Sequence, residues 1–75
     1  MTDISAAQCR AARGLLSWTQ EDLAKKSAVG LNTIRKFERN KTSPHRTTLK
    51  VLKETFEKAG IEFIDDGGLG VKLKG

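Results

Sequence analysis

Apolar residues recur every three or four positions along most of the chain, which is the spacing of one face of an α-helix. A first helix is predicted to follow Ser5, whose hydroxyl can cap it, and to weaken near Gly14. A last helix is predicted to begin after Thr47 or Thr48 and to end near Gly60. Its apolar stripe consists of Leu49, Leu52, Phe56 and Ala59.

Two short helices separated by a tight corner are predicted between them. Thr19 begins the first, because its hydroxyl can bond an orphan amide. Asp22 stands where Glu or Gln would complete a capping box, so we expect that box to be imperfect. The corner is residues 28–30, and the second short helix runs from about Leu31 through Arg39. Asn40 is expected to stop it, because Asn tolerates the left-handed conformation found just past helix ends.

After Gly60 the helical spacing gives way to an alternation of apolar and polar residues, which is typical of β-strands. Two such runs, Ile61 to Ile64 and Val71 to Leu73, flank turn residues at 65–68 and predict a β-hairpin over about 61–74. Since an isolated hairpin is only marginally stable, it must pack on the helices or pair with another chain. The fold class expected is mainly α, one domain over 1–75 with helices over about 5–59 and a C-terminal β-hairpin.

The chain has 75 residues, enough for one domain with a small core. Its formal charge is +5, from 14 Lys and Arg against 9 Asp and Glu. A basic balance on a small domain favours an anionic partner, nucleic acid first. A solvated basic surface without any partner fits the charge equally well.

Little in the sequence suggests an enzyme. The chain has one His, one Cys and no Tyr, and no glycine-rich phosphate loop precedes a lysine. The neighbouring carboxylates of Asp65 and Asp66 fit a solubilising turn better than a metal or acid–base site. Cys9, alone among Ala and Arg, suits a buried structural thiol better than a nucleophile. We therefore expect no catalysis, metal, cofactor or small-molecule ligand.

The sequence also lacks an apolar run long enough to span a bilayer and the pattern of a signal peptide. A single cysteine allows no disulfide within the chain and fits a reducing compartment. We expect no membrane partner and a cytoplasmic location.

The stretch from Thr19 through Lys26, the corner at 28–30 and the stretch from Thr33 through Glu38 resemble the Cro/C1-type (XRE) family of bacterial and phage repressors, which includes restriction–modification controller proteins. The resemblance covers about Ser5 to Ala59 and rests on Thr-Gln opening the helix before the corner, the apolar spacing across the corner, and Phe-Glu near the end of the helix after it. It implies a lambda-repressor-like bundle of four to five helices and a transcriptional regulator, chiefly a repressor, whose second short helix enters the major groove. It also implies a bacterial or phage-encoded protein that associates with the nucleoid when bound to DNA.

Base-reading residues are expected at the start and on the outer face of that helix: Leu31, Asn32, Thr33, Arg35 and Lys36. The chemistry agrees, since Asn can bond bidentately to adenine, Lys or Arg to guanine, and Leu can touch a thymine methyl. Phosphate contacts are expected at two places. They are the start of the first short helix and the segment after the second: Thr19, Gln20, Arg39, Lys41, Thr42, His45 and Arg46. The alternative for the later segment is a polar loop without a ligand.

Three further residues are given structural roles. The resemblance implies a buried ion pair between Arg13 and Glu38 that ties the first helix to the recognition helix, although both could be surface charges. Trp18 is expected to pack as a hydrophobic staple onto Leu23 or the first helix. Ala28 stands where the family often has Gly, which implies left-handed strain of about 1 kcal/mol. Gly30 stands where Ser or Thr usually caps the recognition helix.

One recognition helix reads only a few base pairs, so double-stranded DNA with an inverted repeat and a homodimer are expected. The dimer interface is expected on the last helix and the hairpin, because apolar residues there exceed what a small monomer buries easily. Its residues would be Phe56, Ile61, Phe63, Val71 and Leu73. The alternative is a protein-interaction module, such as an antitoxin or anti-activator component, that uses the same fold.

Overall fold

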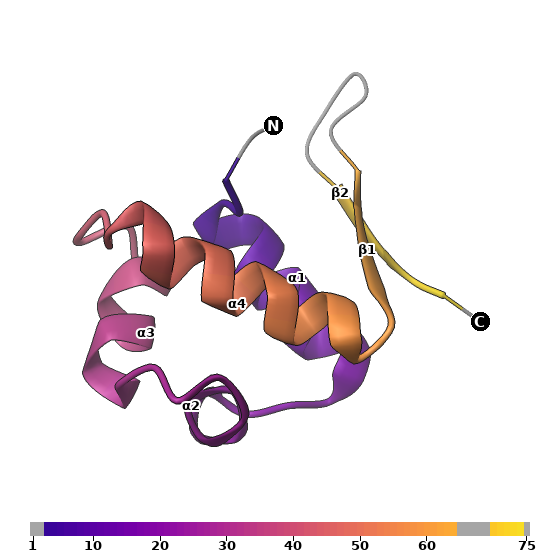
Figure 1. The fold of residues 1–75 in the computed structure, drawn as a ribbon, viewed down its shortest axis with the longest axis horizontal. Coiled ribbons are helices and arrows are strands. Elements are labelled where there is room, and N and C mark those ends of the chain that lie inside the picture. The colour runs from indigo at the N-terminus through magenta and orange to yellow at the C-terminus, as the bar shows by residue number, and fades with distance from the viewer. Residues whose placement is uncertain (1–2, 65–69, 75) are drawn as a thin grey trace.

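The computed structural model describes residues 3–64 and 70–74. This part of the chain forms four helices followed by two antiparallel strands (Figure 1). The elements are α1 (Ala6–Leu16), α2 (Gln20–Ser27), α3 (Leu31–Glu38), α4 (Arg46–Lys58), β1 (Ile61–Ile64) and β2 (Gly70–Leu73). The mainly α fold with a C-terminal hairpin is thus confirmed, and the turn predicted at 65–68 lies outside the described residues.

Reciprocal caps begin the first two helices. Ser5 Oγ accepts from the Gln8 amide at 3.1 Å, and Gln8 Oε1 accepts from the Ser5 amide at 2.9 Å. At α2, Thr19 Oγ1 and the Asp22 amide are 3.0 Å apart, and Asp22 Oδ2 is 3.0 Å from the Thr19 amide. The expectation of an imperfect box was therefore wrong, because the shorter aspartate side chain still reaches back to the first amide.

The later helix ends differ from their predicted positions by one or two residues. Helix α3 ends at Glu38, with Arg39 as its C-cap, and Asn40 takes the predicted left-handed conformation with φ 59°. Helix α4 begins at Arg46, ahead of the predicted caps Thr47 and Thr48. Its first turn closes on His45, whose carbonyl accepts from the Leu49 amide at 3.1 Å. The two threonines therefore lie inside the helix and do not cap it.

The core lies where the four helices and β1 meet. Its largest fully buried side chains include Leu23, Ile34, Leu52, Phe56 and Ile61, one or more from each of α2, α3, α4 and β1. Helix α1 adds Cys9 and Ala12, both completely buried. Burying each large apolar side chain contributes about 1.5–3 kcal/mol, so this shared cluster is what fixes α2 and α3 relative to each other.

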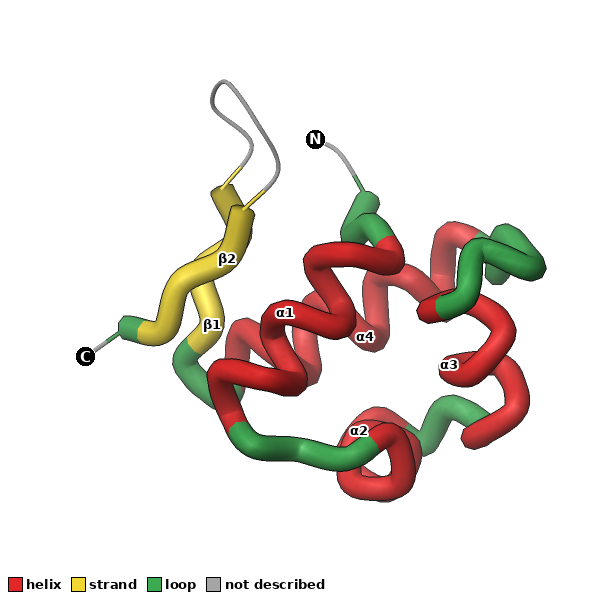
Figure 2. The backbone as a smooth tube through the Cα atoms, turned by 180° about the vertical axis from the view of Figure 1, so that it is seen from behind, coloured by secondary structure: helices red, strands yellow, loops and turns green. Residues whose placement is uncertain are grey.

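The hairpin packs on helices of its own chain. Strand β1 lies against α4 and β2 against α1 (Figure 2). Ile61 pairs with Leu73 and Phe63 with Val71, so these four side chains share one face of the hairpin. Ile61, Phe63 and Val71 pack on the core, and the ring of Phe63 meets Phe56 edge-on with centroids 6.2 Å apart. Gln8 of α1 adds a hydrogen bond to the Gly70 carbonyl at 3.2 Å.

This packing corrects the expected dimer interface. Phe56 is 0% and Ile61 1% exposed, so neither can contact another chain without unfolding. Phe63 and Val71 are half-buried against the same core. Leu73, 46% exposed, is the one member of the expected set that stays largely accessible. The apolar surplus is absorbed within the chain, because the hairpin covers the helix faces that a partner was expected to cover.

Candidate nucleic-acid interface

The corner between α2 and α3 is held by one serine side chain. Ser27 Oγ donates to the Leu23 carbonyl at 2.7 Å and accepts from the Val29 amide at 3.2 Å. Between these contacts Ala28 adopts the left-handed conformation, with φ 60° and ψ 20°. The strain predicted for Ala28 is therefore present, at a cost of about 1 kcal/mol for a residue with a Cβ.

Helix α3 turns its polar side outward because its apolar side is anchored. Ile34 is 0% and Phe37 7% exposed, which fixes the rotation of the helix about its axis. Asn32, Arg35 and Lys36, at helical spacings of three and four, are exposed together on the opposite side. Leu31 and Thr33, also expected to read bases, are half-buried at the flanks of this polar side.

The connection from α3 to α4 continues the polar surface. Arg39, Lys41, Thr42 and His45 are exposed, and the Arg46 side chain is 87% exposed. Arg46 Nε lies 3.7 Å from Asp3 Oδ2, which brings the N-terminal segment beside the start of α4. The basic residues predicted to bind phosphate in this segment are thus all exposed, on the connection that directly follows α3 and at the first residue of α4.

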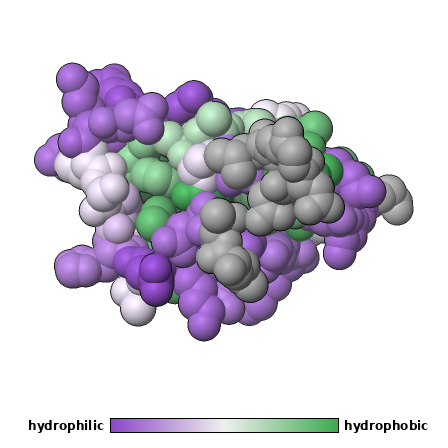
Figure 3. All heavy atoms as spheres, turned by 90° about the horizontal axis from the view of Figure 1, so that it is seen from above, coloured by the Kyte–Doolittle hydropathy of each residue, from purple (hydrophilic) through white to green (hydrophobic). Residues whose placement is uncertain are grey.

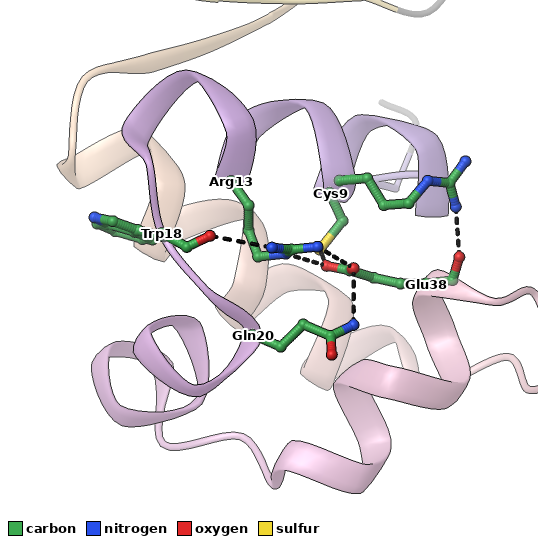
Figure 4. Close-up of polar contacts among 6 residues, drawn as sticks. Cys9, Arg13, Trp18, Gln20 and Glu38 are labelled. Carbon is green, nitrogen blue, oxygen red and sulfur yellow. Dashed lines mark hydrogen bonds and ion pairs between the residues drawn. The ribbon is translucent and has the colours of Figure 1, made fainter.

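Glu38, at the end of α3, accepts hydrogen bonds from side chains of two other elements, α1 and α2 (Figure 4). Arg13 reaches both carboxylate oxygens, with Nη2–Oε1 at 2.6 Å and Nε–Oε2 at 2.7 Å, so the expected ion pair is present. Gln20 Nε2 lies 3.1 Å from Oε1, and Cys9 Sγ lies 3.2 Å from Oε2. This network joins α1, the start of α2 and the end of α3 at a side chain that is 2% exposed.

The hydrogen bonds set the ionisation of the network. Burial alone would raise the pKa of the Glu38 carboxyl, but donation from Arg13, Cys9 and Gln20 outweighs it and holds that pKa below its ordinary value. The same bond to Glu38 raises the pKa of Arg13. Burial raises the pKa of the Cys9 thiol far above its usual range. Cys9 is therefore a neutral donor to Glu38 at physiological pH.

The two residues expected to hold a phosphate at the start of α2 already have partners. Thr19 Oγ1 accepts the capping bond from Asp22, and Gln20 gives one amide hydrogen to Glu38. A carboxamide has a second N–H and an oxygen, and a hydroxyl can still donate. Both side chains therefore retain donors, with Gln20 held in one orientation by a buried carboxylate.

Trp18 packs on α4. Its ring stacks on Phe56 with centroids 5.7 Å apart and an interplanar angle of 23°. On α2, Lys26 Nζ lies 5.2 Å from the centroid of the Trp18 ring. Arg13 Nη1 donates to the Trp18 carbonyl at 3.0 Å. The residue is structural, as expected, but its principal partner is an aromatic ring that the staple pattern did not indicate.

Arg10 was not assigned from the sequence, although the structure brings it to this site. Its Nη1 donates to the backbone carbonyl of Glu38, at the end of α3. The available signal was its position one turn before Arg13 on the same helix, which places both arginines on one side of α1.

Among the described residues, no group of three or more His, Cys, Asp or Glu side chains lies close enough together to hold a metal ion. None of the helices described is both long and apolar enough to cross a membrane.

Residues 10–61 match the family of helix-turn-helix domains, which is more than half of the chain. The match runs from Arg10 in α1 to the first residue of β1 and includes the corner, α3 and the basic connection to α4. A comparison with curated proteins returns no match. The chain therefore belongs to the helix-turn-helix family of Cro/C1 (XRE) type, a family of DNA-binding regulators.

Proposed function

We propose that this protein is a sequence-specific transcriptional repressor that binds an inverted-repeat operator as a homodimer, with α3 in the major groove. The observation that carries the proposal is the exposed row of Asn32, Arg35 and Lys36 on a helix whose rotation is fixed by Ile34 and Phe37. Among the described residues none of these three side chains takes part in an ion pair. Their donors are free to meet the edges of bases.

Phosphate contacts on both sides of α3 would set the register of the protein on DNA. Gln20, oriented by Glu38, would donate to one strand. Lys41 and Arg46, exposed on the α3–α4 connection, would donate to phosphates past the C-terminal end of the recognition helix. The formal charge of +5 supports a salt-dependent contribution to affinity from these residues.

We further propose that the two copies associate when they bind DNA. Leu15, Val51 and Leu73 are the large apolar residues exposed in the described part of the chain, at 44%, 39% and 46%. These three half-exposed side chains are fewer than the apolar core of a permanent interface usually contains. An operator that holds two copies side by side would raise their effective concentration, and so would favour a contact between them that is too weak to form in free solution. The protein would act in the cytoplasm of a bacterium or of a phage-infected cell.

Selection of bound duplexes from a random pool tests the proposal directly. The expected product is an inverted repeat whose half-site centres are about 10–10.5 base pairs apart. Binding of the selected duplex should weaken steeply as salt rises. If no sequence were enriched after repeated rounds, the protein would not be a sequence-specific DNA reader.

The variant Asn32→Ala separates base reading from phosphate contact. We expect it to lose about 1–3 kcal/mol on the selected operator and to relax preference at one base pair of each half-site. Lys41→Ala is the matched control, because a lost phosphate contact weakens all sequences alike. Binding measured by anisotropy on the operator and on single-base variants distinguishes the two. A uniform loss with Asn32→Ala would reassign that residue to the backbone.

A further inference from the structure

Arg10 extends from α1 to the end of α3. Its side chain is exposed, and Nη1 donates to the carbonyl of Glu38, which immediately precedes Arg39. Arginine has five N–H donors in a planar fork, and this bond uses one of them. The guanidinium therefore lies where α3 passes into the basic connection, and it keeps further N–H donors besides the one that binds the carbonyl.

The charge of Arg10 is not neutralised by its surroundings. The carboxylate of Glu38, the residue whose backbone carbonyl Arg10 binds, is already bound at both oxygens by Arg13. The ion pairs among the described residues join Arg13 to Glu38, Arg46 to Asp3 and Lys72 to Glu62, and none involves Arg10. Arg10 binds the carbonyl of the residue directly before Arg39, so two cationic residues lie at the C-terminal end of α3, an arrangement that favours an anion near them.

We propose that Arg10 is a DNA-contacting residue that donates to the backbone phosphate lying against Arg39, so that α1 forms part of the interface. This inference rests on the proposed function, because it assigns a further contact to the same DNA surface. A planar fork suits a phosphate oxygen pair, and the bond to Glu38 leaves Arg10 oriented before DNA arrives. Arg10 would then hold the C-terminal end of α3 and the DNA strand at the same time.

The test compares Arg10→Gln with Arg10→Lys in the full chain. Gln removes the charge but keeps an N–H for the Glu38 carbonyl, whereas Lys keeps the charge. Binding to the selected operator and to a random-sequence duplex pool is measured over a range of salt concentrations. We expect Arg10→Gln to reduce the slope of log K against log salt by about 0.9, and Arg10→Lys to leave it close to that of the wild type.

Two controls separate phosphate contact from support of the helix. Lys74→Gln removes the same charge from the exposed end of the hairpin and should leave the salt slope close to that of the wild type. Thermal unfolding of each variant without DNA reports any structural role. If Arg10→Gln lowered the melting temperature but kept the wild-type slope, Arg10 would only cap α3 and the proposal would be wrong. If the wild type itself bound no duplex, the proposed function would fail first, a result distinct from failure of Arg10 alone.

Discussion

At the scale of single residues, the helix-turn-helix depends on a few left-handed backbone conformations, which are more favourable for some residue types than for others. Ser17, Ala28 and Asn40 have positive φ angles of 58°, 60° and 59°. Asn suits this conformation because its short polar side chain can bond locally, whereas Ala has no such compensation. The corner therefore stores a small strain at Ala28, which the bonds of Ser27 to both sides hold in place.

Replacing Ala28 by glycine should relieve that strain. We expect Ala28→Gly to raise the free energy of unfolding by about 1 kcal/mol, since the side chain is exposed and loses no packing. Urea titration measures the change. Gly14→Ala in α1 is the control substitution: apart from its chain neighbours and the backbone of its own helix, nothing lies within 4 Å of the new Cβ, and the helical backbone favours Ala. If Ala28→Gly lowered the free energy of unfolding instead, the greater flexibility of Gly in the unfolded chain would outweigh the strain that is relieved at the corner.

Glu38 should make stability depend on acid. Its folded-state pKa is held below the ordinary value of 4.5, so its contribution is complete above that pH and is lost as the pH falls through the folded pKa. Glu38→Gln, which leaves Arg13 without its partner, should cost about 3–5 kcal/mol at neutral pH. The difference from the wild type should shrink below pH 4.5, where the wild type also loses the charge.

Chemical denaturation at several pH values gives this profile. Asp22→Asn is the comparison variant, because the backbone bond to Thr19 lowers the pKa of Asp22 in the same direction, but without a buried partner. A pH-independent gap between the wild type and Glu38→Gln would show that the charge of Glu38 is not what stabilises the network.

At the scale of elements, the hairpin acts as a lid on the helical core. Its inner face supplies Ile61 to the core, and Phe63 extends the aromatic contacts of Trp18 and Phe56. The hydrogen bond from Gln8 to Gly70 and that from the Lys74 amide to the Gly60 carbonyl, at 3.2 Å and 2.8 Å, fasten both ends of β2. The two strands therefore contribute to the stability of the single chain.

Two alanine variants test this assignment. Ile61→Ala should lower the free energy of unfolding by about 2–5 kcal/mol, because it opens a cavity in the core. Leu73→Ala, on the same face but 46% exposed, should cost less than about 1 kcal/mol. Unfolding curves at several protein concentrations should coincide for both. A concentration-dependent loss with Ile61→Ala would instead place that residue in a subunit interface.

Local signals explain which elements could be predicted. Hydroxyl caps at Ser5 and Thr19 and the left-handed Asn40 are determined within a few residues, and the sequence locates them well. The start of α4 was missed because the sequence favours a hydroxyl cap, while the helix closes on His45. Phe56 and Ile61 were wrongly expected at the dimer interface for another reason: the apolar pattern predicts that they are buried, but not which chain buries them. Arg10 was missed because its partner is a backbone carbonyl: its spacing from Arg13 places it on one side of α1 but does not indicate that partner.

At the scale of the whole molecule, α3 and the hairpin lie at opposite ends of the longest dimension, which is 29 Å (Figures 1 and 2). Pairing through hairpins would place two recognition helices nearly twice that length apart, which exceeds the roughly 34 Å between successive major grooves on one side of DNA. Hydrophilic residues also cover much of the face seen in Figure 3, with apolar atoms showing between them. The distance therefore disfavours pairing through the hairpins on the operator.

The free protein should therefore be a monomer that binds DNA cooperatively. We expect sedimentation equilibrium at micromolar concentration to give one chain without DNA and two chains on a duplex with both half-sites. A duplex with a single half-site should bind one chain, more weakly. A stable dimer in the absence of DNA would contradict this order of assembly.

The bond between Cys9 and Glu38 has a practical consequence for measuring motion. Cys9 is the only thiol of the chain, is completely buried, and is held neutral beneath a carboxylate. A thiol reagent can modify it only when local opening exposes the side chain. The labelling rate of the wild-type protein therefore reports how often such openings occur. A slower labelling rate of Cys9 in the presence of operator DNA would show that bound DNA suppresses these openings around the recognition helix.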